Sequence, residues 1–347
     1  MEQILGILYH SIGGFSSASF YVPYNGVKNW SWSTYWIVLG FVAWIIMPAV
    51  GGMITSSDLW QILSSSSLSS KVLSWFYGFL WGFGGLLAGL GLRYLGLALG
   101  QSVCLGVSAI VGTVIPAIMQ DKLVLLFTTI PGAIILMGFL LCIVGVFLCG
   151  YAGVLKDRLL SDADKKASVK EFSAVKGFTM AVLGGVFSAC MAFAISAGEP
   201  IAQKAEQMGT NPVFVNIPIF VLALGGGFCS NLIYNIITST RNKTFGDYTV
   251  SPRSTLFRNY GLAFLSGLMW YGQFFFYGMG SAKMGKYDFA SWSIHMASII
   301  IFSNLWGMVL QEWKATTAST RMYLWLGIIM LIISVVLIGA GNNMAGI

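Results

Sequence analysis

The chain alternates long apolar stretches with short polar ones. Ten stretches each hold about the 20 residues that cross a hydrocarbon core of about 30 Å as an α-helix. They occupy residues 4–24, 33–54, 69–95, 98–119, 131–151, 173–195, 212–236, 257–281, 289–310 and 321–341. The pattern predicts an all-α polytopic membrane protein with ten transmembrane helices.

The composition identifies the solvent that this apolar surface faces. Of 347 residues, 56% are hydrophobic and 9% are charged, whereas soluble domains are about one quarter charged. So few charges do not coat a polar exterior, and the surplus apolar surface must therefore contact a lipid bilayer.

Candidate chemistry is sparse. The net charge is +7, but the basic residues form neither one helix face nor a long run, which argues against nucleic-acid binding. The five cysteines lie inside apolar stretches without metal-ligand spacing, so neither a metal site nor a cofactor is expected. No nucleophile–base pair is apparent, and an enzyme is not predicted.

The distribution of Lys and Arg predicts the orientation of the chain in the membrane. Fourteen of the 19 basic residues fall in the odd-numbered loops, and five fall in the even-numbered loops: Lys71, Lys122, Lys204, Lys283 and Lys286. Loops rich in Lys and Arg stay in the cytoplasm. We therefore expect a multi-pass protein of a bacterial inner membrane with both termini on the outer, periplasmic side.

A cysteine in the central loop tests this orientation. The Ser161→Cys protein should resist an impermeant thiol reagent in intact cells and react after permeabilisation, because residue 161 is predicted to be cytoplasmic. The unsubstituted chain gives the background from its own cysteines. Ready labelling of Ser161→Cys in intact cells would reverse the topology.

Two short motifs recur in the same order in both halves of the chain. Residues 13–18 (GGFSSA) resemble residues 184–189 (GGVFSA), and residues 79–82 (FLWG) resemble residues 264–267 (FLSG). Because each half would hold five helices, the second half enters the membrane with opposite polarity, as in the inverted repeats of secondary transporters. The predicted units are a first repeat at 1–155, a cytoplasmic connecting loop at 156–172 and a second repeat at 173–347.

Glycines with a spacing of four predict close helix packing in the first half. Small residues at this spacing let helix backbones approach one another. The pairs are Gly78 and Gly82, Gly85 and Gly89, and Gly96 and Gly100.

Three nitrogen-bearing polar side chains fall within apolar segments at a similar depth. With the termini outside, His10, Gln273 and His295 lie roughly 6–8 Å outward of the midplane of their helices, at 1.5 Å per residue. Polar groups in lipid-spanning helices are costly and therefore need a partner or a function. The shared depth favours a solute site, although hydrogen bonding between helices is the alternative for both histidines.

The helical neighbours of these three residues are polar and aromatic. Ser17 and Tyr21 share a predicted face with His10, Trp270 and Tyr277 share one with Gln273, and Asp288 and Trp292 share one with His295. Aromatic rings beside amides and hydroxyls suit a sugar, because rings cover its apolar face while polar groups bind its hydroxyls. The aromatic residues could also serve packing or interfacial anchoring.

Two charged residues, Arg93 and Glu312, fall at cytoplasmic helix ends. The sequence leaves two roles open for these residues, a gating ion pair and simple solvation at the membrane interface.

The chain resembles the L-rhamnose–proton symporters of the drug/metabolite transporter superfamily. The resemblance runs through residues 19–24 (SFYVPY), 30–32 (WSW), 93–96 (RYLG), 187–189 (FSA), 267–277 (GLMWYGQFFFY), 287–288 (YD), 291–292 (SW), 295–296 (HM) and 312–313 (EW). It implies ten helices in two inverted halves and sugar uptake driven by protons. It also matches His10, Arg93, Gln273, Tyr277, Asp288, Trp292 and His295 to the family pattern.

Two stretches depart from that pattern. The family's third helix carries asparagines and a tyrosine where this chain has GGLLAG at residues 84–89, and the family's AMNA of the sixth helix is AISA at residues 194–197. These departures bear on the identity of the sugar more than on the fold or the transport class.

The sequence therefore predicts a secondary active transporter that imports L-rhamnose or a related monosaccharide with protons by alternating access. Its partners are the sugar, protons and the lipid bilayer, and its oligomeric state is left open. His295 is the first candidate for proton coupling, because an acid and a tryptophan share its predicted face, with Asp288 and His10 next. A facilitator or exporter of another small polar metabolite, or a membrane sugar sensor, is the alternative.

Overall fold

All the secondary structure in the described residues is helical. The computed structural model describes residues 2–95, 97–159 and 174–345, apart from a few side chains that include that of Arg93. Its long helices are α1 (Glu2–Ser19), α5 (Leu68–Leu95), α6 (Leu97–Met119), α8 (Ile130–Arg158), α10 (Ala174–Ala197), α12 (Ile217–Asn242), α13 (Arg253–Ser281), α14 (Ser291–Val309) and α15 (Ala318–Ala345).

Shorter helices complete the chain. α2 (Trp32–Phe41), the π-helical turn η2 (Val42–Ile46) and α3 (Met47–Thr55) together form one further long rod. The connecting helices are α4 (Leu59–Ser65), α7 (Leu125–Thr128), α11 (Glu199–Gln207) and the 3-10 helices η1 (Val22–Gly26), η3 (Pro212–Phe214), η4 (Phe245–Tyr248) and η5 (Gly285–Ala290).

Seven helical stretches in the described chain are long and apolar enough to cross a membrane. They are Trp32–Thr55, Leu68–Gly91, Ile130–Lys156, Val175–Gln207, Pro212–Asn242, Gly285–Val309 and Ala318–Ala345. The predicted segments 4–24, 98–119 and 257–281 are not among them. Segments 4–24 and 257–281 correspond to α1 and α13, which hold His10, Ser266 and Gln273 and are therefore less apolar.

Proline explains the break in the rod formed by α2, η2 and α3. Pro48 follows η2 and has no backbone N–H to donate to the carbonyl four residues earlier. The Met47 N–H instead bonds to the carbonyl of Val42, five residues earlier, which widens the helix locally. The wide turn carries Trp44, whose buried ring lies against Trp81 and Trp270 near the centre of the molecule.

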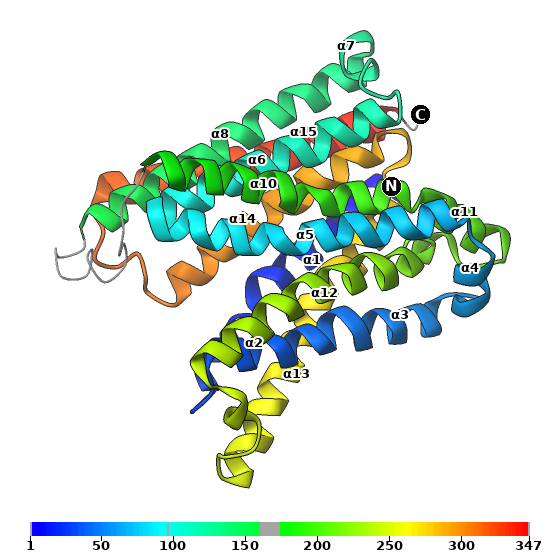
Figure 1. The fold of residues 1–347 in the computed structure, drawn as a ribbon. Coiled ribbons are helices and arrows are strands. Elements are labelled where there is room, and N and C mark those ends of the chain that lie inside the picture. The colour runs from blue at the N-terminus through cyan, green and yellow to red at the C-terminus, as the bar shows by residue number, and fades with distance from the viewer. Residues whose placement is uncertain (1, 96, 160–173, 346–347) are drawn as a thin grey trace.

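Helices from the two halves of the chain pack in an interleaved bundle. α5 packs along α10 and α12, and α8 packs along α15. α1 packs between α13 and α14, and α6 contacts α10. The chain ends marked N and C lie at the same end of the bundle as α7 and α11 (Figure 1).

Glycines make several of these helix contacts possible. A Cβ on Gly78 or Gly82 of α5 would overlap atoms of α12, so both residues are needed for that close approach. Gly85 and Gly89 have the same spacing, but no described residue lies within 4 Å of a Cβ built on either, and the predicted close packing is wrong for that pair. Gly96 lies outside the described residues.

The glycine pair of the recurring sequence motif lies at close helix contacts in both halves. In α1, Gly13 faces α13 and Gly14 faces Ser298 of α14. In α10, Gly184 faces Ala88 of α5 and Gly185 faces Val107 of α6. In each half, the pair thus lets one helix pack closely against two helices of the other half.

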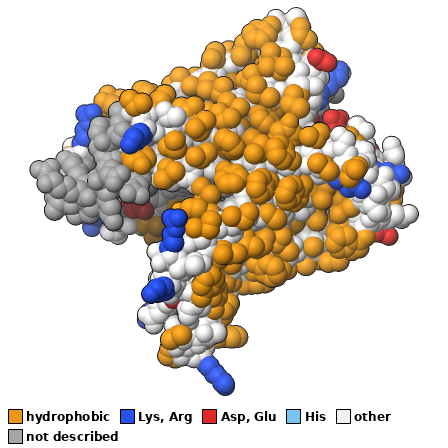
Figure 2. Space-filling model, in the orientation of Figure 1, with side chains coloured by type: hydrophobic (Ala, Val, Ile, Leu, Met, Phe, Trp, Pro, Cys, Tyr) orange, Lys and Arg blue, Asp and Glu red, His pale blue; other side chains and the backbone are white. Residues whose placement is uncertain are grey.

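The exterior is apolar around the middle of the bundle. Large hydrophobic side chains such as Phe147, Ile130 and Phe257 are mostly exposed. Figure 2 shows a band of hydrophobic side chains across the visible face, with Lys and Arg near its two ends. Such a surface fits a lipid environment for the band and water or headgroups for the ends.

Candidate functional site

The two histidines of the chain meet in the interior. His10 of α1 and His295 of α14 are both 0% exposed, and their ring centroids are 6.2 Å apart. None of the four ring nitrogens has a hydrogen-bond partner among the described residues. Because unpartnered buried polar groups are costly, this pair is a candidate functional centre rather than a set of satisfied helix contacts.

Tyr277 of α13 covers the histidine pair. Its ring centroid lies 5.2 Å from that of His10 and 5.3 Å from that of His295, with edge-on geometry to both. Gly13 and Gly280 leave room for this arrangement, because a Cβ on Gly13 would lie 3.3 Å from His295 and one on Gly280 would lie 2.8 Å from His10. The three side chains therefore form one compact unit between α1, α13 and α14.

Gln273 and the predicted tryptophans surround this unit. Gln273 is buried one helical turn before Tyr277. The backbone carbonyl oxygen of Gln273 lies 2.8 Å from a Cβ placed on Gly13. Trp292 packs 5.9 Å from Tyr277 and donates a hydrogen bond from Nε1 to the Ser108 carbonyl of α6. Trp270 belongs to a deeper cluster, 5.1 Å from Trp44.

Two of the predicted helical faces do not extend as far as the sequence suggested. α1 ends at Ser19, so Tyr21 does not share the face of His10. Tyr21 is 51% exposed and stacks on Trp32 at 5.9 Å, while Ser17 stays buried in α1. Asp288 precedes α14 and belongs to the 3-10 helix η5, so its side chain is not on the α-helical face of His295.

Asp288 forms an ion pair at the end of the bundle where the chain termini lie. Lys122, between α6 and α7, donates a hydrogen bond of 2.7 Å to its carboxylate. The pair connects the segment between α6 and α7 to η5. Because both side chains are partly exposed, it contributes little to the stability of the fold.

Glu312 forms an ion pair with Lys156. Lys156, at the end of α8, donates a hydrogen bond of 3.1 Å to Glu312 and lies over the ring of Trp313. The side chain of Arg93 lies outside the described residues, so a gating role for Arg93 stays a prediction.

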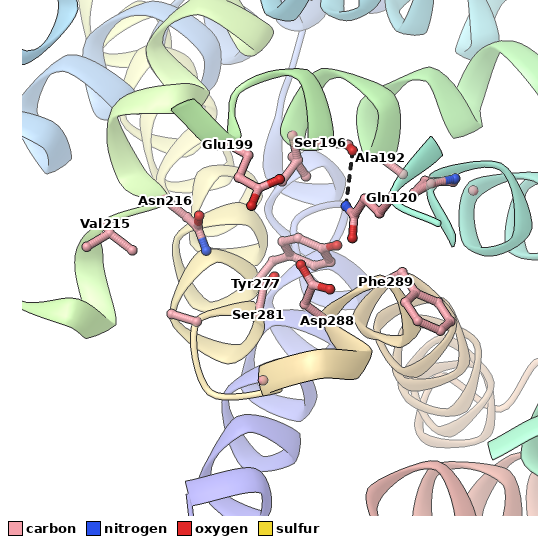
Figure 3. A pocket seen from close by; sticks show the side chains of 15 residues that line it. Gln120, Ala192, Ser196, Glu199, Val215, Asn216, Tyr277, Ser281, Asp288 and Phe289 are labelled. Atoms are coloured by element: carbon pink, nitrogen blue, oxygen red, sulfur yellow. Dashed lines mark hydrogen bonds between the residues drawn. The ribbon is translucent and has the colours of Figure 1, made fainter. Parts of the chain in front are cut away.

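A cavity of about 210 Å³ lies next to the histidine unit, on the other side of Tyr277. It is lined by residues of α6, α10, α11, α13 and η5 and of the segments that follow α6, precede α12 and follow α13: Gly112, Pro116, Gln120, Ala192, Ile195, Ser196, Glu199, Val215, Asn216, Tyr277, Ser281, Ala282, Gly285, Asp288 and Phe289. Figure 3 shows Glu199, Gln120 and Asp288 around the ring of Tyr277. The cavity lies at the end of the bundle that carries α11.

Sequence reasoning placed only two of these residues, Tyr277 and Asp288, in the site. Gln120, Ser196, Asn216 and Ser281 fall at or just beyond helix ends, where polar residues are common for solvation alone. Ser196 lies in the AISA stretch at residues 194–197 that departs from the family pattern. For Gln120, Asn216 and Ser281, no signal in the single sequence separates them from ordinary interface residues. The structure brings them together because α6, α10 and α13 end, and α12 begins, around the same space.

The described residues hold no group of three His, Cys, Asp or Glu side chains that could bind a metal ion. The arrangement as a whole is a polar cavity and a buried titratable pair that meet at one aromatic ring. A site of this kind can bind a small polar solute and a proton close together.

Comparison with known proteins gives one consistent match. The family model described as L-rhamnose-proton symport protein (RhaT) matches residues 1–345. The L-rhamnose-proton symporters of Yersinia pestis (strain Pestoides F) and Yersinia pseudotuberculosis serotype O:1b (strain IP 31758) are each 36% identical over 342 residues, covering 97% of this chain and 98% of the relative. That of Yersinia pestis bv. Antiqua (strain Antiqua) is 35% identical over the same length.

Proposed function

The chain belongs to the L-rhamnose-proton symport protein family, and we propose that it imports L-rhamnose or a closely related monosaccharide together with protons. The observation that carries this proposal is the cavity beside two fully buried histidines. A histidine titrates close to pH 6.5 in water and so is suited to loading and releasing protons near neutral pH. Tyr277 lines the cavity and packs against both histidines, which would let sugar binding and proton binding influence each other.

We propose that the mechanism is alternating access between the two ends of the bundle. The cavity lies at the end with α11, which the Lys and Arg bias assigns to the outside. At the opposite end, Asn259 exchanges two hydrogen bonds with the backbone of Lys28, and Asp247 accepts bonds from Ser31 and Thr34. These contacts join α2 to the α12–α13 region and suit an inner gate that is shut while the outer cavity is accessible.

The proposal includes ten membrane spans in two inverted five-helix repeats. The packing supports it when α1, α5, α6 and α8 of the first half are matched with α10, α13, α14 and α15 of the second. Under this exchange, the contact between α5 and α10 corresponds to that between α13 and α1, and the contact between α6 and α10 corresponds to that between α14 and α1. The contact between α8 and α15 maps onto itself. The matching neighbours of the two glycine pairs follow the same exchange.

The test of this function is the uptake of labelled L-rhamnose by cells that produce the protein, with and without a protonophore. Concentrative uptake that the protonophore abolishes is the expected result. Equilibration that the protonophore leaves unchanged would instead identify a facilitator, and absence of any sugar uptake by a folded, membrane-inserted protein would contradict the proposal.

Gln273 is proposed to bind the sugar during transport. A side-chain amide both donates to and accepts from hydroxyls, and loss of one hydrogen bond at a buried site costs about 1–3 kcal/mol when the partner is left unpaired. We therefore expect Gln273→Ala to weaken L-rhamnose binding by roughly fivefold to 150-fold while the protein remains folded. Unchanged affinity in an equilibrium binding assay would leave Gln273 with a packing role.

A further inference from the structure

The wall between the cavity and the histidine pair is built around one side chain. Neither His10 nor His295 is among the residues that line the cavity, and both are fully buried. Tyr277 lines the cavity, and its ring packs edge-on against both imidazoles, with centroid separations of 5.2 and 5.3 Å. This ring therefore has the cavity on one side and the titratable pair on the other.

The cavity is open at its rim and closed at Tyr277. The lining residues Glu199 and Gly285 are exposed, and Asp288 is partly exposed beside its partner Lys122. At the inner wall, Tyr277 is 4% exposed. Figure 3 shows its ring next to the carboxylates of Glu199 and Asp288. Water and protons that enter at the rim thus reach the cavity side of this ring, while the imidazoles lie behind it.

The three helices that carry His10, Tyr277 and His295 hold few other charges. α14 has no charged residue. α1 has Glu2, which lies two helical turns before His10 and is ion-paired with Lys283. α13 has Arg253 and Arg258 at the end remote from Tyr277. The acids of the cavity, Glu199 and Asp288, are therefore the charged groups that face the pair, and they do so across the ring of Tyr277.

We infer that the ring of Tyr277 is a barrier that shuts the histidine pair off from the cavity, so that protons reach the imidazoles only when this side chain moves. The inference rests on the proposed function for the use of these protons, and it adds the residue that controls their entry. A neutral imidazole accepts a proton at one ring nitrogen, and the donor must lie within hydrogen-bond distance of that nitrogen or reach it through a water.

The hydroxyl of Tyr277 does not relay protons in this arrangement. All four imidazole nitrogens lack a hydrogen-bond partner among the described residues, so the phenol oxygen is bonded to neither histidine. What Tyr277 places against the pair is the apolar body of its ring, which excludes water and carries no exchangeable proton. The barrier is therefore a property of the ring, and the hydroxyl is dispensable for it.

A barrier at this position protects the coupling of sugar to protons. Excluding water from a site prevents proton leakage. A transporter whose histidines stayed open to the cavity would load protons without sugar and dissipate the gradient that drives uptake. Removing the ring is therefore expected to produce a proton leak that needs no sugar.

The histidine content of the chain makes the barrier measurable without transport. His10 and His295 are its two histidines, so diethylpyrocarbonate, which acylates the neutral imidazole nitrogen, forms N-carbethoxyhistidine from this pair alone. Its ultraviolet absorbance is followed in purified full-length protein that carries no histidine tag. The double variant His10→Gln/His295→Gln gives the background from other side chains.

Variants of α13 form a matched set. Tyr277→Ala removes the ring, and Tyr277→Phe removes only the hydroxyl. Phe274→Ala removes another buried ring, whose centroid lies 6.4 Å from that of His295 but which does not line the cavity. Tyr277→Leu replaces Tyr277→Ala if the alanine variant does not fold, and all proteins are compared below their unfolding midpoints.

We expect slow acylation in the wild type, in Tyr277→Phe and in Phe274→Ala. Acylation of Tyr277→Ala should be faster by about tenfold or more, since tenfold corresponds to removing only ~1.4 kcal/mol of opening free energy. In proteoliposomes without sugar, Tyr277→Ala should also let protons enter down an imposed potential, whereas Tyr277→Phe should not.

Equal acylation rates for Tyr277→Ala and Phe274→Ala would overturn the inference, and so would a wild type that reacts as fast as its unfolded chain. Acylation of Tyr277→Phe as fast as that of Tyr277→Ala would contradict a barrier made by the ring. Because these rates are measured without transport, a shielded wild type that fails to couple sugar to protons would defeat the proposed function alone.

Discussion

Replacing His295 with glutamine is expected to abolish accumulation of sugar against a gradient while leaving sugar binding and exchange. Glutamine keeps hydrogen-bonding ability but does not titrate near neutral pH. A membrane potential of 100 mV supplies about 2.3 kcal/mol per proton, which corresponds to accumulation of roughly fiftyfold. In proteoliposomes with an imposed potential, the accumulation ratio should therefore fall from tens to about one.

The matched control is His10→Gln. His10 faces His295 across 6.2 Å and is equally close to Tyr277. Among the described residues, however, no residue of α1 lines the cavity, whereas η5, which lines the cavity with Asp288 and Phe289, leads into α14 at Ser291. We therefore expect His10→Gln to retain accumulation. If His295→Gln accumulates sugar with the pH dependence of the wild type, His295 is not the coupling group. His10 would then replace it, since the carboxylate of Asp288 is held by Lys122.

Gly226→Ala is expected to destabilise the protein strongly, whereas the neighbouring Gly225→Ala is not. A Cβ on Gly226 of α12 would overlap the backbone carbonyl oxygen of Trp75 and lie 2.7 Å from the backbone nitrogen of Phe79. Backbone atoms of α5 do not rotate aside as a side chain does, so the two helices must separate. Overpacking of this kind costs about 1–3 kcal/mol, and more where relaxation is blocked.

Gly225 supplies the control because, in the part of the chain that the structure describes, no atom lies within 4 Å of a Cβ built on it. Alanine there should be neutral or slightly stabilising, since it is favoured over glycine in a helix by up to about 1 kcal/mol. Thermal unfolding of the detergent-solubilised proteins compares the two variants. Equal midpoints for Gly226→Ala and Gly225→Ala would show that α5 and α12 do not approach as closely as the structure indicates.

The helical nature of the chain could be predicted from its apolar stretches, because lipid requires each spanning backbone to satisfy its own hydrogen bonds. Close packing was less predictable. Gly78 and Gly82 share their spacing with Gly85 and Gly89, but only the first pair faces α12. Spacing defines a helix face, and the neighbour on that face depends on the whole bundle.

Only part of the candidate site could be predicted from the sequence. Depth along the helices placed His10 and His295 in one layer, and the structure brings their rings together. Extrapolating helical faces failed for Tyr21 and Asp288, because α1 ends before Tyr21 and α14 begins after Asp288. The cavity residue Gln120 lies just beyond the end of α6, where a polar residue has an ordinary explanation in solvation.

The central claim is that sugar and protons move together through this protein. It is tested most directly in proteoliposomes with no imposed gradient, by adding L-rhamnose outside and following the internal pH with a trapped dye. The account predicts acidification of the lumen that depends on L-rhamnose and is lost in His295→Gln. Entry of labelled L-rhamnose into the same vesicles without any change in internal pH would contradict it.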